Sequence, residues 1–251
     1  MAAPFLWPKP VRVFVNSMSD LFHERVPDEY IEDLARVMIE APWHTYQVLT
    51  KRHERMASLL AGRLSFAAGC EHIWWGVICE DRKFGLPRIA TLQTINAARR
   101  FVSVEPLLED LGDFDMTGID WAIVGGESGP KARPMEPEWV DNVQRVCDRD
   151  GTIFFFKQWG GMHKKLTGRT LHDRTWDDMP TLSAAPFPSR GVRVEKAKPW
   201  NERAEYWASM QPVVPLVQIE VRLRSNSRGT QGRSAASSRS TSVRTNRWPR
   251  S

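Results

Sequence analysis

Cysteine is scarce in this chain, and the spacing of the cysteines indicates no metal site. The three cysteines, Cys70, Cys79 and Cys147, form no CxxC-type pair, so neither a zinc site nor an iron–sulfur site is indicated. The six histidines show no HExxH or comparable spacing, which gives no sign of a metal role for them. We expect the cysteines to be small buried residues in a reducing compartment.

Long apolar runs and a leader sequence are also lacking. No run approaches the roughly 18 residues that a membrane-spanning helix requires. Residues 1–10 contain three prolines and no apolar core of the kind found in signal peptides. We therefore expect a cytoplasmic protein that has no membrane partner.

Acidic residues are absent from residues 221–251, which contain eight arginines. Subtracting these eight charges from the net charge of +5 leaves −3 for residues 1–220, so the basic character belongs to the tail. Arginine and serine dominate this tail, and we predict that it is disordered because it cannot offset its ordering entropy. Its arginines predict a weak, salt-sensitive contact with nucleic acid.

The remaining sequence alternates between strand and helix patterns. Four helices are expected at about 27–41, before Gly62, around 89–95 and at 137–151, and six strands at 11–15, 46–49, 73–79, 101–104, 119–124 and 153–156. Most of these strands are apolar on both faces, which favours a parallel sheet covered by helices. We predict an α/β fold, a parallel-stranded (β/α) barrel that is incomplete with about six strands. An open doubly wound sheet is the alternative.

The same patterns predict three parts in the chain. Residues 1–180 form the partial barrel-like domain. Residues 181–220 form a poorly defined C-terminal extension with one helix near 201–210, and residues 221–251 form the disordered tail.

Polar side chains follow most of the predicted strands at their carboxyl ends. In a parallel barrel these ends meet at one rim, whatever the order of the strands. Glu105 and Glu127 each follow a very apolar run, and Lys157 follows the last strand. Carboxylates beside apolar strands need a cation, hydrogen bonds or a ligand to remain charged. We predict that these three residues are catalytic.

Other residues of the predicted rim are candidates for binding a ligand. The glycines of Gly-Gly-Glu-Ser let a ligand approach the main chain, and the turn could hold a phosphate or carboxylate through backbone N–H groups. The segment Gly-Gly-Glu-Ser-Gly departs from the GxSxG turn, which argues against a serine hydrolase. The candidate binding residues are Asn16, Ser19, Asp20, Lys51, Arg52, Gly125, Gly126 and Ser128.

Several long phrases of the sequence resemble a known family. They are VFVNSMSDLFHE (13–24), YQVLTKR (46–52), RFVSVEPLL (100–108), DWAIVGGESGPKARPM (120–135), FFFKQWG (154–160) and RTWDDMP (174–180). The chain resembles, over residues 5–180, an uncharacterised bacterial and phage family, a domain of unknown function placed beside the radical S-adenosylmethionine TIM barrels. The resemblance implies a radical-SAM-type barrel, S-adenosylmethionine as the cofactor and an origin in a phage or prophage.

This chain departs from the family in one respect that affects the expected activity. In the family, an N-terminal segment carries a three-cysteine motif that is expected to hold a [4Fe–4S] cluster. This chain begins beyond that point, so we expect a truncated form that holds no [4Fe–4S] cluster and is inactive as a radical enzyme. Glu127 is similar to the acid of the GGE motif that contacts the methionyl amine in radical-SAM enzymes, although it follows a late strand.

Three functions therefore stay open. The first is a radical-SAM-like enzyme that lacks its cluster segment. The second is a binding or partner protein whose rim holds a small molecule, a nucleotide or a nucleic acid. The third is a non-radical lyase or hydrolase that uses Glu105, Glu127 and Lys157.

Overall fold

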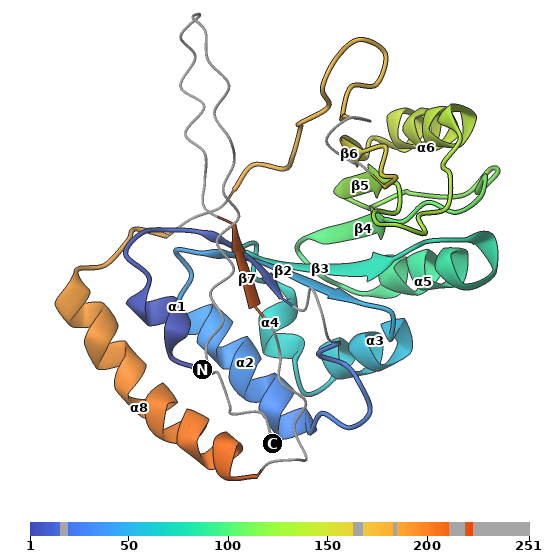
Figure 1. Cartoon of the computed structure of the whole chain (residues 1–251). Helices are drawn as coiled ribbons and strands as arrows, with labels where there is room; N and C mark the ends of the chain where they lie inside the picture. Colours follow the sequence, from blue (N-terminus) through green and yellow to red (C-terminus); the bar gives the residue numbers. More distant parts are fainter. Residues whose placement is uncertain (16–19, 163–167, 183–184, 211–218, 223–251) are drawn as a thin grey trace, which may run out of the picture. The chain divides into compact units, whose positions relative to one another are not determined.

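The computed structural model describes five stretches of the chain, which are residues 1–15, 20–162, 168–182, 185–210 and 219–222. The chain divides into two compact units. Unit 1 comprises residues 1–48 and 183–251, and unit 2 comprises residues 49–182. Figure 1 traces the course of the chain by colour, with the two ends of unit 1 in blue and in orange to red.

Unit 1 combines the first strands with helices from both ends of the chain. Its elements are α1 (Ala3–Leu6), β1 (Arg12–Val15), α2 (Asp28–Glu40), the first part of β2 (Thr45–Thr50), α8 (Arg190–Ser209) and β7 (Ile219–Arg222). β1 pairs in parallel with β2 and antiparallel with β7. α2 follows Pro27 and carries Asp28 and Glu29 in its first turn, where the helix dipole favours acids.

Two buried side chains fix the N-terminal segment of unit 1. The imidazole of His44 is fully buried, its Nδ1 accepts a hydrogen bond from the backbone N–H of Val11 at 3.1 Å, and its Nε2 lies 2.8 Å from the carbonyl oxygen of Pro4. The guanidinium of Arg193, on α8, donates to the carbonyl oxygens of Phe5 and Trp7 at 3.0 and 2.6 Å. These bonds satisfy backbone groups that would otherwise be buried without partners.

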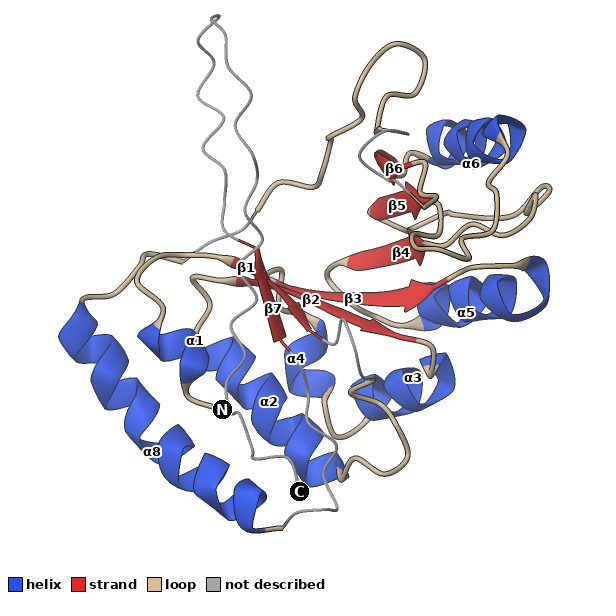
Figure 2. Cartoon of the chain, in the orientation of Figure 1, coloured by secondary structure: helices blue, strands red, loops and turns tan. Residues whose placement is uncertain are grey.

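Unit 2 contains four strands that pair in chain order, all parallel. Its elements after β2 are α3 (His53–Ala61), α4 (Ser65–Ala68), β3 (Ile73–Ile78), α5 (Arg82–Thr94), β4 (Arg100–Val104), β5 (Trp121–Gly125), α6 (Pro137–Asp150) and β6 (Ile153–Gln158). α5 packs against β3 and β4, and α6 packs against β6 (Figure 2). The prediction of an α/β fold with about six parallel strands is confirmed, since β1–β6 are parallel in every pairing within a unit.

One face of the sheet in unit 2 leads directly to the predicted site. Three aromatic rings pack together on this face. The ring of Trp121 lies 5.7 Å from that of Trp74 and 5.5 Å from that of Phe155. Successive side chains of a strand point to opposite faces, so every second residue shares this face. Counting in twos along β5 from Trp121 leads to Gly125. The pairing of β5 with β6 shifts by one residue here, and a Cβ on Gly125 would lie 3.5 Å from Cβ of Lys157.

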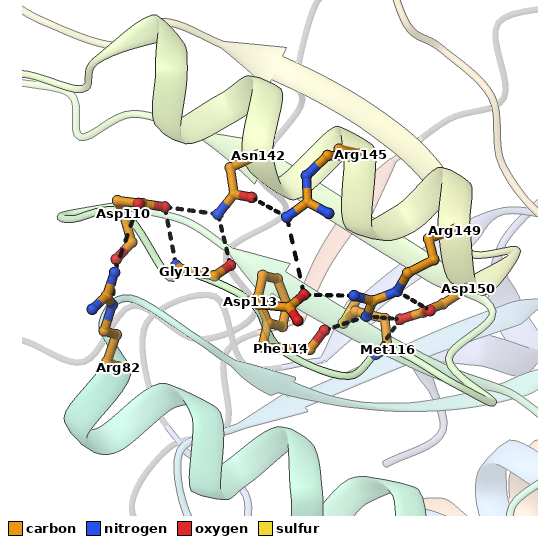
Figure 3. Close-up of polar contacts among 10 residues, drawn as sticks. All are labelled: Arg82, Asp110, Gly112, Asp113, Phe114, Met116, Asn142, Arg145, Arg149 and Asp150. Atoms are coloured by element: carbon orange, nitrogen blue, oxygen red, sulfur yellow. Dashed lines mark hydrogen bonds and ion pairs between the residues drawn. The ribbon is translucent and has the colours of Figure 1, made fainter.

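The connection between β4 and β5 contains no helix and is held by side chains instead (Figure 3). Asn142, on α6, donates through Nδ2 to Oδ1 of Asp110 and to the carbonyl oxygen of Gly112, both at 2.7 Å. In the last turn of the same helix, Arg149 donates to the carbonyl oxygen of Phe114 at 2.5 Å. The carboxylate of Asp150 then accepts from the backbone N–H of Met116 at 2.8 Å. α6 thereby fixes the path that the chain follows into β5.

The C-terminal extension is more regular than the sequence predicts. α8 begins at Arg190, eleven residues before the expected helix at 201–210. β7 was not predicted, and it places residues 221 and 222, the first two of the predicted disordered tail, in a strand. Four residues are too few to show a periodic pattern, which is why the strand was missed. Residues 223–251 lie outside the described stretches, so their predicted disorder stays a prediction. None of the described helices combines the length and apolarity needed to cross a membrane.

Candidate functional site

The carboxyl ends of β4, β5 and β6 surround a hollow of about 330 Å³ in unit 2. The residues that line it are Glu105, Pro106, Gly126, Glu127, Ser128, Lys157 and Gln158. The hollow therefore brings together all three of the predicted catalytic residues and two of the predicted binding residues. The reason is topological, because parallel neighbouring strands end on the same side.

Glu105 and Lys157 form an ion pair inside the hollow. Nζ of Lys157 lies 2.7 Å from Oε2 of Glu105, and their side chains are 33% and 20% exposed. Such partial burial strengthens the attraction relative to a surface pair, and it makes either charge costly to leave alone. Gly125 lies between them, since a Cβ there would be 3.5 Å both from Oε1 of Glu105 and from Cβ of Lys157. Oε1 of Glu105 therefore lies next to Gly125, in van der Waals range of the position that a Cβ would take.

Beyond the strands, the chain segments that follow β5 and β6 are joined closely. The backbone N–H of Gly126 donates to the carbonyl oxygen of Gln158 at 3.0 Å, and the N–H of Gly161 donates to that of Glu127 at 2.7 Å. A Cβ on Gly126 would lie 2.0 Å from the carbonyl oxygen of Trp159, which is part of the backbone and cannot move aside. Glycine is therefore required at position 126 because two chain segments approach each other closely there. Gly126 also lies in the wall of the hollow.

Ser128 and Gln158 supply neutral polar groups to the hollow. Nε2 of Gln158 donates to Oγ of Ser128 at 2.5 Å and lies 3.4 Å from the carbonyl oxygen of Gly126. In this contact the hydroxyl oxygen of Ser128 accepts the hydrogen bond, so its O–H group can still donate one to a ligand. The amide oxygen of Gln158 is a second acceptor, so both donors and acceptors line the hollow.

Glu127 is bound by a residue that the sequence analysis missed. Its carboxylate accepts hydrogen bonds from Nε, Nη2 and the backbone N–H of Arg133 at 2.8, 3.1 and 3.0 Å. The hydrogen bonds from the guanidinium and the backbone N–H of Arg133 lower the pKa of Glu127 to about 2. A carboxylate with so low a pKa is a poor general acid or base near neutral pH. Arg133 lies in a loop rather than at a strand end, so the rim argument gave no reason to single it out.

Lys51 and Arg52 also belong to unit 2, but neither lines the hollow. Lys51 forms an ion pair with Glu80, the residue that follows the strand β3 by two positions. Glu80 is also held by Nη1 of Arg88 at 3.0 Å. The backbone N–H of Arg52 donates to Oγ1 of Thr50 at 2.9 Å, which is a turn contact at the end of β2.

The remaining candidates come from the segment after β1 in unit 1. Oδ1 of Asp20 accepts from the backbone N–H of Phe22 at 3.0 Å, a local turn contact. Asn16 and Ser19 lie outside the described residues. The structure therefore does not test the assignment of these two residues to a ligand site.

The described cysteines are thiols whose pKa is raised by burial. The pKa of Cys79 and of Cys147 rises to about 12, with nearby carboxylates adding to the effect. Burial raises the pKa of Cys70 as well. Within the described stretches, no group of three or more His, Cys, Asp or Glu side chains is placed to hold a metal ion.

Comparison with known proteins identifies the family. Residues 1–180 match the model of a family described as protein of unknown function (DUF5131), and the chain belongs to this family. No curated protein and no solved structure matches the chain. The predicted resemblance to a domain of unknown function is confirmed, whereas the phage origin and the relation to radical-SAM enzymes stay predictions.

Proposed function

We propose that the chain is a radical-SAM-like protein of phage or prophage type with an incomplete TIM barrel, and that it binds a small ligand in the hollow at β4–β6. The observation that carries this proposal is the half-buried pair of Glu105 and Lys157 in the wall of the hollow. Oppositely charged side chains held together in a concave site are typical of binding or catalytic centres.

The charges of the hollow favour a ligand that itself carries both signs. Each carboxylate is matched by one cation, Glu105 by Lys157 and Glu127 by Arg133. A ligand with a single charge would break one pair and leave the displaced partner unmatched, which is unfavourable in a partly buried site. A ligand with an amine and a carboxylate can engage both partners at once.

The methionyl end of S-adenosylmethionine has this combination of groups, and the residues of the hollow fit it. Glu105 can accept a hydrogen bond from the amine through Oε1, and Lys157 can donate to the carboxylate. The O–H of Ser128 is a second donor. When bound, S-adenosylmethionine supplies a sulfonium whose neighbouring carbon is open to nucleophilic or reductive cleavage.

The described residues do not fit a [4Fe–4S] cluster. Such a cluster needs thiolate ligands, and Cys79 and Cys147 are buried thiols with raised pKa values. We therefore derive no role for a cluster held by these residues. Glu127, with its pKa lowered to about 2 by Arg133, also weakens the alternative of a hydrolase that uses this carboxylate as its base.

The proposal is tested by the binding of S-adenosylmethionine and S-adenosylhomocysteine to the full chain, measured by isothermal titration calorimetry and by the shift in melting temperature. A double variant, Glu105→Gln with Lys157→Met, removes both charges without leaving either one unmatched, and it should lose binding. The control is Lys83→Met, which removes a lysine that lies over the ring of Phe84, outside the hollow. It should bind as the wild type does. Failure of both ligands to bind the wild type, or equal binding by the double variant, would contradict the proposal.

A further inference from the structure

The loop that follows the hollow comprises residues 129–136 and ends at the start of α6. Its first residue, Gly129, is bonded to the chain after β6, and its middle is bonded to Glu127. One of its hydrogen bonds is internal, from the N–H of Ala132 to the carbonyl oxygen of Gly129 at 3.1 Å. Among the described residues, the hydrogen bonds between residues 130–135 and the chain outside loop 129–136 run from Arg133 to the carboxylate of Glu127.

The backbone of Glu127, whose carboxylate binds Arg133, is held by the chain after β6. The carbonyl oxygen of Glu127 accepts from Gly161, and a Cβ on Gly160 would lie 2.2 Å from that same oxygen. Gly129 in turn donates to the carbonyl oxygen of Gly161 at 3.2 Å. The backbone of Glu127 is therefore fixed against the chain after β6, while the middle of the loop depends on a side chain.

The chemistry of the attachment is that of an arginine fork on a carboxylate. Nε and Nη2 of Arg133 contact different oxygens of Glu127, and the backbone N–H of Arg133 shares one of them. Bidentate contacts of this kind fix orientation as well as distance, which a lysine cannot do. The two side chains are 58% and 32% exposed, so the contact is open to competition from solvent and from a ligand.

We infer that Glu127 is a positioning residue, whose carboxylate holds loop 129–136 beside the hollow through Arg133 and does not itself transfer protons. Because Glu127 lines the hollow, a ligand that enters it contacts the residue on which the loop depends. Occupancy of the hollow and order in the loop are then coupled. This coupling rests on the proposed function, whereas the attachment of the loop does not.

Limited proteolysis by trypsin tests the attachment without a ligand. Lys131 is exposed and lies in the middle of the loop, and the bond after Arg133 resists trypsin because Pro134 follows it. We expect Glu127→Gln to increase the initial rate of cleavage after Lys131 severalfold, measured by mass spectrometry of the full chain. The melting temperature should stay unchanged, because local opening of a surface loop does not require global unfolding.

Two further variants separate the contribution of shape from that of charge. Arg133→Lys keeps the charge and loses the fork, and it should also speed the cleavage after Lys131. Glu138→Gln removes an exposed carboxylate at the start of α6 and is the matched control, with no expected change. Unchanged cleavage in Glu127→Gln would overturn the inference, and so would a fall in melting temperature that accounts for the faster cleavage.

The same proteolysis experiment in the presence of a ligand distinguishes this inference from the proposed function. S-adenosylmethionine should slow the cleavage of the wild type after Lys131 if it occupies the hollow and stabilises the attachment. If the variants speed cleavage and S-adenosylmethionine has no effect on the wild type, the positioning role stands and the proposed ligand is wrong. If the ligand binds and Glu127→Gln is cleaved like the wild type, the proposed function stands and the positioning role is wrong.

Discussion

The buried imidazole of His44 should make the stability of the protein fall as the pH is lowered from 7 to 5. Its Nδ1 accepts from the N–H of Val11, and its Nε2 faces the carbonyl oxygen of Pro4. This arrangement fits the neutral ring with its proton on Nε2. A second proton would have to sit on Nδ1, opposite an N–H group. Burial lowers the pKa of His44 from 6.5 to about 4; the hydrogen bond to Pro4 acts against this shift, and the charge of Arg193 adds to it.

The size of the effect follows from the difference between the two pKa values. Because the folded pKa lies below the unfolded one, the stabilisation is fully present above pH 6.5 and is lost as the pH falls towards about 4. A shift of this size corresponds to about 3.5 kcal/mol at most, since one pKa unit is worth about 1.4 kcal/mol. About 2 kcal/mol of this should be lost between pH 7 and pH 5.

Urea unfolding of the wild type and of His44→Gln at both pH values measures this contribution. Glutamine offers an oxygen to Val11 and an N–H to Pro4, and it does not titrate. The variant should therefore lose about 2 kcal/mol less stability than the wild type between pH 7 and pH 5. Equal losses in the wild type and His44→Gln would refute the reasoning.

Three other predictions concern the backbone in different parts of the chain. Gly126→Ala should destabilise the protein strongly in urea unfolding, because the new Cβ would lie 2.0 Å from the backbone oxygen of Trp159. Gly191→Ala is the contrasting variant. It should stabilise the protein by about 0.5–1 kcal/mol, because Gly191 is in a helix and has open space around the position of a Cβ. Asp173→Gly should stabilise by about 1 kcal/mol in the same assay, because Asp173 has a φ of +59° in a tight turn that glycine adopts without strain. Asp150→Asn should speed hydrogen exchange at the amide of Met116, which loses a charged acceptor; an unchanged exchange rate would contradict this.

The strands and the location of the hollow could be predicted because they depend on simple patterns. Apolar runs such as the one that ends at Gly125 identify buried strands, and parallel pairing places the ends of such strands together. This rule alone places Glu105 and Lys157 at one rim, and in the structure they form an ion pair. The spacing between them is 52 residues, so their contact is set by the topology and not by local sequence.

The first half of α8 could not be predicted because its pattern is inverted. Val192 and Val194 are exposed, while Arg193 between them is buried. A periodicity search expects the apolar side chains inside and the charge outside. Arg193 is tolerated inside because it donates to three backbone carbonyl groups, those of Phe5, Trp7 and Pro188. Phe5 and Trp7 lie far away in the sequence, and nothing near Arg193 indicates them.

The charges at the strand ends show both the value and the limit of the sequence argument. Carboxylates beside apolar strands were expected to need a cation, hydrogen bonds or a ligand, and the sequence does not assign the partners. Lys51 was a candidate partner of the site carboxylates, and it binds Glu80 instead. Glu127 takes a cation from its own loop, six residues away. With Glu127 committed to Arg133, Glu105 is the carboxylate of the hollow whose Oε1 faces the space over Gly125. The chemistry of the site should therefore depend more on Glu105 and Lys157 than on Glu127.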